Sequence, residues 1–170
     1  RAGDAIVWWE NYHHVEPATV IDRCFKQQSD FDWNDEDTFY VPDAGGMGQG
    51  VMFKFAFKRH MEFHTAGRAT MREYDNLMTQ AWFEFGKKTQ KGAFFVPKDS
   101  RLMQQLSSRQ YYTVEKTGKL IIESKDDYKK RMSSTIDDGG SPDRADGLIL
   151  ASYDGGADTG HLALPRRQTA

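Results

Sequence analysis

Asp43 is the first residue whose type and position could do chemistry. It follows an extended apolar stretch at residues 38–41 and precedes the glycine-rich run AGGMGQG at residues 44–50. Open α/β sheets gather their ligand groups at the carboxyl ends of strands, which is where this pattern puts Asp43. The run is not the dinucleotide motif GxGxxG, because residue 51 is Val, and a carboxylate beside it would repel a pyrophosphate. The pattern therefore favours a bound cation over a bound dinucleotide. The alternative, a glycine turn with no ligand, explains the glycines but not Asp43.

Asp143 and Asp146 form a second acidic group. They lie three residues apart at the start of a predicted helix, after Ser141 as the N-cap and Pro142 as the first helical residue, so they share a face. The helix dipole accounts for Asp143. Asp146 instead adjoins the apolar run LILA at residues 148–151, and a carboxylate beside a buried helix face needs a partner or a metal.

Carboxylates brought together from a strand end and a helix start predict a hard-oxygen site for Mg²⁺ or Mn²⁺. Two such ions roughly 3.5–4 Å apart would activate a water molecule and stabilise the leaving 3′ oxygen during phosphodiester cleavage. Each ion needs several oxygen ligands, and three aspartates are few for two ions. We therefore expect a further acidic ligand.

The composition bounds the classes of function. The chain has 170 residues, the length of one ordinary domain, and a formal net charge of −2, so any nucleic-acid contact must come from local basic patches. Aromatic residues make up 13% of the chain, which argues against disorder. A single cysteine excludes a disulfide framework and a multi-thiolate metal site. No stretch approaches the roughly 18 apolar residues of a membrane helix.

The elements expected around Asp43 follow from β-branched content, helical spacing and turn residues. They are a strand at residues 5–15, a helix from Pro17 with Cys24 in its apolar stripe, a strand at residues 38–41, a helix at residues 51–57 and a polar linker at residues 60–67. The strand at 38–41, the glycine run and the helix after it form one strand–loop–helix unit that presents Asp43.

The second half of the chain is predicted to be more helical. Its longest amphipathic helix spans residues 68–85, with Gly86 as the C-cap and a basic cluster of Lys87, Lys88 and Lys91 beyond it. The further elements are a helix at residues 99–107, a hairpin closed around residues 117–118, a charged helix at residues 123–131 and the helix from residue 143. We expect one domain at residues 1–153 and a flexible tail at residues 154–170.

Four segments resemble the nuclease domain of tailed-phage terminase large subunits. FYVPDAGGMGQGV at residues 39–51 is similar to the second-acid strand of that family, and residues 68–85 resemble the helix after it. KLIIESKDD at residues 119–127 resembles an element of pattern GKIxIESKDD, and SPDRAD at residues 141–146 resembles the closing SPDxAD motif. The four occur in the family's order across residues 2–152, which makes the match specific where each alone is weak.

The resemblance implies an α/β fold of the RNase H-like (RuvC-type) class, with a mixed central β-sheet flanked by helices. It implies a two-metal-ion endonuclease that cuts concatemeric double-stranded DNA with little sequence specificity during viral genome packaging. The catalytic and metal-binding residues that it carries over to this chain are Asp43, Asp146 and Asp143, with Mg²⁺ or Mn²⁺ as the cofactor. Glu123 and Lys125 are implied as supporting residues near the metal site.

The beginning of the chain departs from the family pattern. The family's first strand carries an Asp a few residues before a glycine-rich turn and a second Asp, and RAGD at residues 1–4 matches only the end of that turn. The primary acid is therefore expected before Arg1, with Asp4 as a weak auxiliary metal ligand. The sequence has no Walker A segment, so the ATPase activity of the packaging motor is expected in an N-terminal domain upstream of this fragment.

The resemblance also implies where and with what the domain works. The setting is the host cytoplasm during virion assembly, and the partners are double-stranded DNA, the N-terminal ATPase domain of the same polypeptide, the small terminase subunit and the portal protein, with no membrane. Basic residues near the site would hold DNA phosphates, although each taken singly also fits ordinary solvated surface. They are Lys87, Lys88, Lys91, Lys129, Lys130 and Arg131.

Two other functions stay open at this point. An RNase H-like junction resolvase is expected to be a self-sufficient dimer, whereas a terminase domain depends on its upstream motor. A catalytically weak module that clamps DNA or docks on the portal is compatible with the missing first acid. Such a module has no need of Asp43, Asp143 and Asp146, and a calorimetric metal titration separates it from a nuclease.

Overall fold

The structure, a computed structural model, describes residues 6, 10, 12, 15–44, 54–55, 57–133 and 140–155. The chain divides into two compact units. We call them the helical unit, Arg1–Asn11 with His64–Tyr153, and the α1 unit, Tyr12–Phe63 with Asp154–Ala170. Among the described residues, no helix combines the length and the apolar character needed to cross a membrane.

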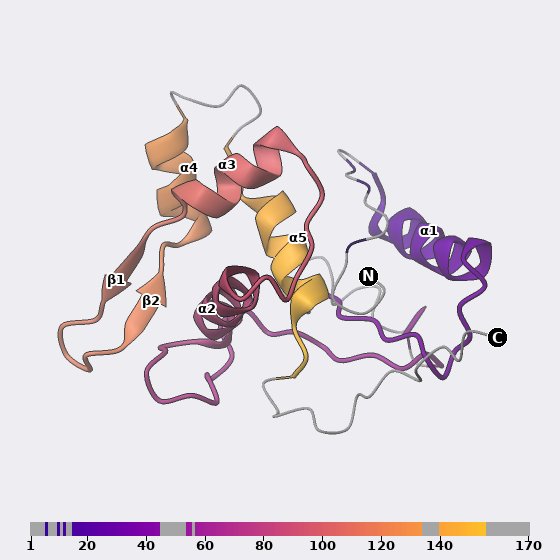
Figure 1. The fold of residues 1–170 in the computed structure, drawn as a ribbon, viewed down its shortest axis with the longest axis horizontal. Coiled ribbons are helices and arrows are strands. Elements are labelled where there is room, and N and C mark those ends of the chain that lie inside the picture. The colour runs from indigo at the N-terminus through magenta and orange to yellow at the C-terminus, as the bar shows by residue number, and fades with distance from the viewer. Residues whose placement is uncertain are drawn as a thin grey trace. The chain divides into compact units, whose positions relative to one another are not determined.

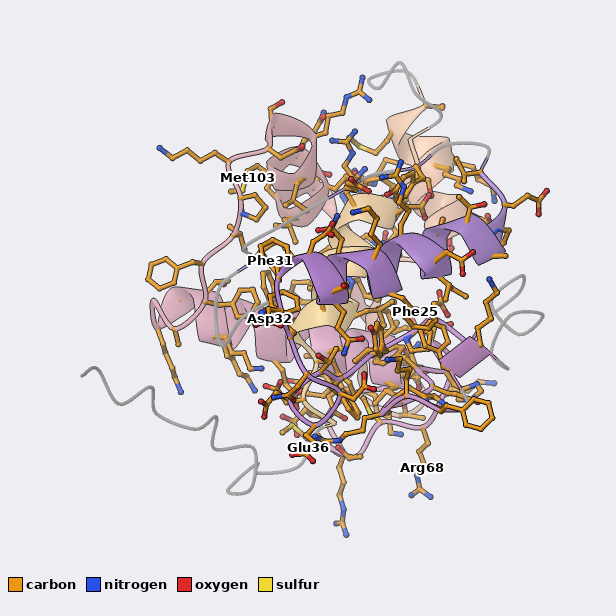
Figure 2. All side chains as sticks on the ribbon, turned by 90° about the vertical axis from the view of Figure 1, so that its right-hand side faces the viewer. Phe25, Phe31, Asp32, Glu36, Arg68 and Met103 are labelled. Atoms are coloured by element: carbon orange, nitrogen blue, oxygen red, sulfur yellow. The ribbon has the colours of Figure 1, made fainter. Side chains whose placement is uncertain are left out.

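Helix α1, Pro17–Asp30, begins where it was predicted, with its proline in the first turn, where a missing N–H leaves no bond unmade. Phe25 projects from α1 (Figure 2) and packs edge to face on Tyr40 and Phe55, with ring centroids 5.4 and 5.7 Å away. Cys24, which was predicted to lie in the buried stripe, is exposed. The helix turns its neighbouring aromatic residue inward instead, because a phenylalanine buries far more apolar area than a cysteine.

Gln28 ties α1 to the strand that leads to Asp43. Its side-chain oxygen accepts from the Tyr40 hydroxyl at 2.6 Å, and its amide nitrogen donates to Trp33 O at 3.1 Å and Asp35 Oδ1 at 2.7 Å. Burial is the main cause that raises the pKa of Tyr40 to about 12, so this hydroxyl keeps the proton that it donates. A buried amide is stable here because its hydrogen-bonding groups have partners.

Residues 40–44 run parallel to residues 60–63. Bridges join Tyr40 to His60 and Asp43 to Phe63, and the N–H of Phe63 donates to Pro42 O at 3.0 Å. The strand predicted at residues 38–41 is thus extended and continues to Asp43. The polar linker predicted at residues 60–67 is wrong for residues 60–63, which supply the partner strand, because Phe63 is completely buried there.

Helix α2, Leu77–Gln90, begins nine residues later than the predicted helix at residues 68–85 and continues through Gly86, which does not cap it. The cause is a set of side-chain hydrogen bonds that the apolar spacing did not reveal. Asn76 caps the helix by accepting from the N–H of Thr79 at 2.9 Å. Gln80, fully buried, accepts from the backbone N–H groups of Thr70 at 2.7 Å and Met71 at 3.1 Å, which holds them outside the helix.

The remaining elements of the helical unit follow the local signals in the sequence. Helix α3 is Ser100–Ser108, strands β1 and β2 are Tyr111–Thr113 and Leu120–Ile122, helix α4 is Lys125–Met132 and helix α5 is Asp143–Ser152. The two strands pair antiparallel, with Tyr111 opposite Ile122, and Gly118 has a φ of +68° in the turn. Pro142 is the N-cap of α5 rather than its first helical residue.

Helix α5 packs on both α2 and α3, and α2 packs on β2 (Figure 1). Leu148 and Ile149 of α5 are almost completely buried, and each such side chain contributes about 1.5–3 kcal/mol to folding. β2 also forms a parallel bridge between Leu120 and Tyr74, so its pairing is mixed. The described residues contain these short pairs and not the continuous central sheet that was expected. The strand predicted at residues 5–15, the helix at 51–57 and the tail at 154–170 fall largely outside them.

We predict that Gln80→Leu destabilises the protein by about 1–3 kcal/mol, because it removes the buried acceptor to which the N–H groups of Thr70 and Met71 donate. Gln90→Leu, at the exposed end of the same helix, is the matched control and should change the free energy of unfolding by less than about 0.5 kcal/mol. Urea denaturation measures both. Equal effects of the two substitutions would contradict the role given to Gln80.

Candidate active site

Asp146 lies near the start of α5 with its side chain only 5% exposed. Its Oδ1 accepts from Trp82 Nε1 at 3.2 Å and lies 3.4 Å from Arg109 Nη1. Its Oδ2 lies 3.2 Å from Lys125 Nζ, although no donor among the described residues makes a well-aligned hydrogen bond to that oxygen. The expectation that this carboxylate needs partners is confirmed, since a buried charge is tolerated only when opposite charges or donors surround it.

Lys125, the first residue of α4, lies between the two acids of α5. Its Nζ is 3.0 Å from Asp143 Oδ1 and 3.2 Å from Asp146 Oδ2. Burial lowers the pKa of Lys125, but the two carboxylates more than offset this effect, so its pKa is raised overall. Burial likewise opposes the charge of Asp143, yet hydrogen bonds from Ser141 and Lys125 lower the pKa of that carboxyl overall. Lys125 and Asp143 therefore keep opposite charges.

Glu123 has both carboxylate oxygens occupied. Arg131 donates from Nε to Oε1 at 2.8 Å and from Nη2 to Oε2 at 2.6 Å, and the backbone N–H of Gln110 donates to Oε2 at 3.2 Å. The Arg131 hydrogen bonds are the main cause that lowers the pKa of Glu123, against the effect of burial. Because both oxygens of this carboxylate already accept charge-assisted or backbone hydrogen bonds, Glu123 is not available as a metal ligand in this arrangement.

Arg131, predicted as a DNA contact, is held by the protein itself. Besides its two bonds to Glu123, its Nη2 donates to Ser108 O at 2.7 Å. The other predicted DNA contacts differ in their surroundings. Lys87 donates to the Tyr74 hydroxyl at 3.1 Å, Lys88 to Ser152 O at 2.9 Å, Lys130 lies 3.6 Å from Asp127, and Lys91 and Lys129 are exposed.

Arg109 and Trp82 belong to the surroundings of Asp146 but were missed in the sequence. Trp82 was interpreted as part of an apolar helical stripe. An indole N–H that faces the interior needs a hydrogen-bond acceptor, so its residue type was a weak signal of a polar partner. No local pattern marks Arg109, which lies between α3 and β1 and reaches Asp146 across 37 positions of the chain. Contacts of that separation depend on how the elements pack.

Asp43 lies at the end of the parallel pair of the α1 unit and is partly buried. Asp143, Asp146, Lys125 and Glu123 are brought together in the helical unit. Asp4 and glycines 45–50 lie outside the described residues. Within the described parts of the chain, no group of three or more His, Cys, Asp or Glu residues is placed to hold a metal ion. The helical unit offers two carboxylates with hard-oxygen chemistry, with one ammonium group between them.

Comparisons with known proteins agree with the resemblance on the fold. No family model and no curated protein sequence matches the chain. A solved structure does match: the K428A mutant nuclease domain of the large terminase subunit gp2 of bacterial virus Sf6, with manganese. The TM-score is 0.73 at 15% sequence identity, and the match covers 90% of this chain and 80% of that chain. The chain therefore has the fold of a terminase nuclease domain, as the sequence motifs predicted.

We predict that Arg131→Met destabilises the protein by about 3 kcal/mol at pH 7, because it leaves the Glu123 carboxylate, 1% exposed, without its cation. Lys130→Met is the matched control, because its pair with Asp127 is exposed and should be worth less than about 1 kcal/mol. Urea unfolding of the three proteins measures the difference.

The pH dependence follows from the lowered pKa of Glu123. A carboxyl whose folded-state pKa lies below its ordinary value of 4.5 adds stability that is complete above that pH and is lost as the pH falls through the folded-state pKa. The advantage of the natural protein over Arg131→Met should therefore hold from pH 7 to about pH 5 and shrink as the pH falls below 4.5. A difference that stays constant well below pH 4.5 would show that the ion pair is not its source.

Proposed function

We propose that this chain is the divalent-metal-dependent endonuclease domain of a viral DNA-packaging motor, which hydrolyses phosphodiester bonds of concatemeric double-stranded DNA with little sequence preference. The observation that carries the proposal is the acidic pair of α5, with buried Asp146 and exposed Asp143 joined by one ammonium group. This pair occurs in a chain that shares its fold with the nuclease domain of Sf6 gp2. The fold limits the range of candidate functions, and the two carboxylates are the groups that could bind a divalent metal.

Asp146, Asp143 and Asp43 are the residues that we propose to hold Mg²⁺ or Mn²⁺, as two ions. Bound ions of this kind activate a water molecule for attack on phosphorus and stabilise the leaving oxygen. Asp146 fits this role because its Oδ1 is fixed by protein donors while its Oδ2 accepts no aligned hydrogen bond within the described residues. Asp143 fits it because its side chain is 63% exposed.

Lys125 serves the same site from α4. Its charge lies between the two carboxylates and reduces their mutual repulsion. Because Glu123 is occupied by Arg131, we assign it to the support of the site rather than to metal binding.

Lys129 is the best-placed of the proposed phosphate contacts. It lies one helical turn after Lys125 on the same face of α4, is exposed, and is close enough to Asp143 to help lower the pKa of that carboxyl. A phosphate held there would lie beside the acidic pair. Lys87, Lys88, Lys91 and Lys130 remain proposed contacts with lower priority.

The fold likeness also favours the packaging setting among the possible ones. We propose the host cytoplasm during virion assembly as the location, and an ATPase domain, a small terminase subunit and a portal protein as partners. A junction resolvase and a DNA-clamping module remain the alternatives, and the following experiment separates all three.

We predict that the protein nicks plasmid DNA with Mn²⁺ or Mg²⁺. Asp146→Asn and Asp43→Asn should each reduce the cleavage rate by more than about 100-fold, because losing a metal ligand should cost more than losing a residue that only positions a ligand. Asp126→Asn, an exposed acid in the first turn of α4, is the control and should leave the rate unchanged. Because the resemblance puts a first acid before Arg1, the assay includes a chain extended N-terminally through that strand.

Each alternative has its own result. DNA binding without cleavage, in the extended chain as well, would contradict the nuclease and favour the clamp. Cleavage confined to four-way junctions would favour the resolvase. Cleavage that survives both Asp→Asn substitutions would show that the reacting groups lie elsewhere.

We predict that Lys129→Gln weakens DNA binding and reduces the slope of log K against log salt by about 1, because one phosphate contact is lost. Lys26→Gln in α1, where the lysine pairs with Asp30 at 2.5 Å, is the control and should leave the slope unchanged. Fluorescence anisotropy with a labelled duplex over a range of salt concentrations measures both. Equal slopes for Lys129→Gln and the natural protein would remove Lys129 from the DNA contacts.

A further inference from the structure

Arg109 is buried to an extent that is unusual for an arginine, with its side chain only 3% exposed. Its guanidinium carbon lies 5.5 Å from the ring centre of Trp82 in α2 and 5.6 Å from that of Tyr128 in α4. Two aromatic rings from two different helices thus contact one guanidinium. These contacts help to offset the cost of removing the charge from water.

The charged end of Arg109 points at the acidic pair. Its Nη1 lies 3.4 Å from Asp146 Oδ1, and the same oxygen accepts from Trp82 Nε1 at 3.2 Å. The buried guanidinium of Arg109 and the half-buried indole of Trp82 therefore hold Oδ1. With Oδ1 held, the carboxylate presents Oδ2 to the side on which Lys125 lies 3.2 Å away.

Glu123 fixes Arg109 in turn. The backbone oxygen of Glu123 accepts from Arg109 Nε at 2.9 Å. Two hydrogen bonds join Glu123 to Gln110, the residue after Arg109. The N–H of Glu123 donates to the backbone oxygen of Gln110 at 2.8 Å, and the side-chain carboxylate of Glu123 accepts from the N–H of Gln110 at 3.2 Å. Since Arg131 clamps that carboxylate with two bonds, the backbone that carries Arg109 has little freedom.

We propose that Arg109 is a positioning residue for Asp146: it holds Oδ1 in the protein, so that Oδ2 faces the side of Lys125 and Asp143, where a divalent cation would bind. The proposal rests on the proposed function, in which Asp146 is a metal ligand. Outer partners of metal ligands act in this way, by fixing the orientation of the ligand, and their removal typically costs 10–100-fold in metal affinity. Arg109 does not itself touch the ion or the DNA in this role.

The test is Mn²⁺ binding, measured by calorimetry in the N-terminally extended chain at a temperature at which circular dichroism shows each variant to be folded. Arg109→Gln should weaken Mn²⁺ binding 10–100-fold. Arg109→Lys keeps the charge but loses the forked geometry, and should recover part of the loss. Arg144→Gln is the matched control: it removes an arginine of α5 that pairs with Asp99 at 2.9 Å rather than with Asp146, and should leave Mn²⁺ affinity unchanged.

A purely structural arginine would give a different result. In that case Arg109→Gln would lower the unfolding temperature while the folded protein bound Mn²⁺ as tightly as the natural chain, and the proposal would be overturned. If Arg109→Gln does not fold, Trp82→Phe replaces it, because it keeps an aromatic ring and removes the other donor to Oδ1; unchanged Mn²⁺ affinity there overturns the proposal equally.

Failure of the proposed function is recognised separately, in the N-terminally extended chain without substitutions. If that chain neither binds Mn²⁺ nor cuts DNA, both the nuclease and the positioning role are wrong. If it does both and Arg109→Gln behaves like Arg144→Gln, the nuclease stands and only the role of Arg109 is wrong.

Discussion

The buried charge of Asp146 is the interaction on which the helical unit depends. Helix α5 must be apolar to bury Leu148 and Ile149 against its neighbours, yet it carries a carboxylate that is only 5% exposed. An unpaired charge in such a place costs several kcal/mol. The fold therefore brings one donor from α2, one from the link before β1 and one from α4 to the same side chain. The relative placement of these elements is constrained by that carboxylate as well as by apolar contact.

The need to place an opposite charge beside each buried charge also applies to the neighbours of Asp146. Arg109 faces Asp146 and is held by Glu123, whose carboxylate is held by Arg131. On the other side, Lys125 joins Asp146 to Asp143. Each buried charge has an opposite charge beside it, and the exposed members lie at the two ends of the series. This arrangement leaves the interior neutral and presents a carboxylate to solvent at the end where we propose chemistry.

Local signals predicted most of the elements, and contacts between distant residues account for the errors. Pro17, Asp99, Gly118 and Ser124 mark the ends and turns of α1, α3, the hairpin and α4, because capping and turn geometry involve only neighbouring residues. The start of α2 was wrong because the side chain of Gln80 binds backbone ten positions away. The site divides in the same way. The short spacing of the two acids of α5 marked them in the sequence, whereas Trp82 and Arg109 reach Asp146 across 64 and 37 positions. That Asp43 acts with these acids stays a prediction.

The energetic character of the network bears on the choice between a nuclease and a module that only clamps DNA. A clamp needs basic surface, which Lys91 and Lys129 supply without help from buried acids. Buried ion pairs are poor devices for stability, since well-packed apolar residues of similar volume often serve as well or better. The network around Asp146 occupies space next to the core that apolar side chains could fill. What it provides, and an apolar core does not, is a carboxylate held in one orientation beside a second, exposed one. Metal-assisted hydrolysis uses oxygen ligands that are fixed in this way, and this supports the nuclease that we propose over the clamp.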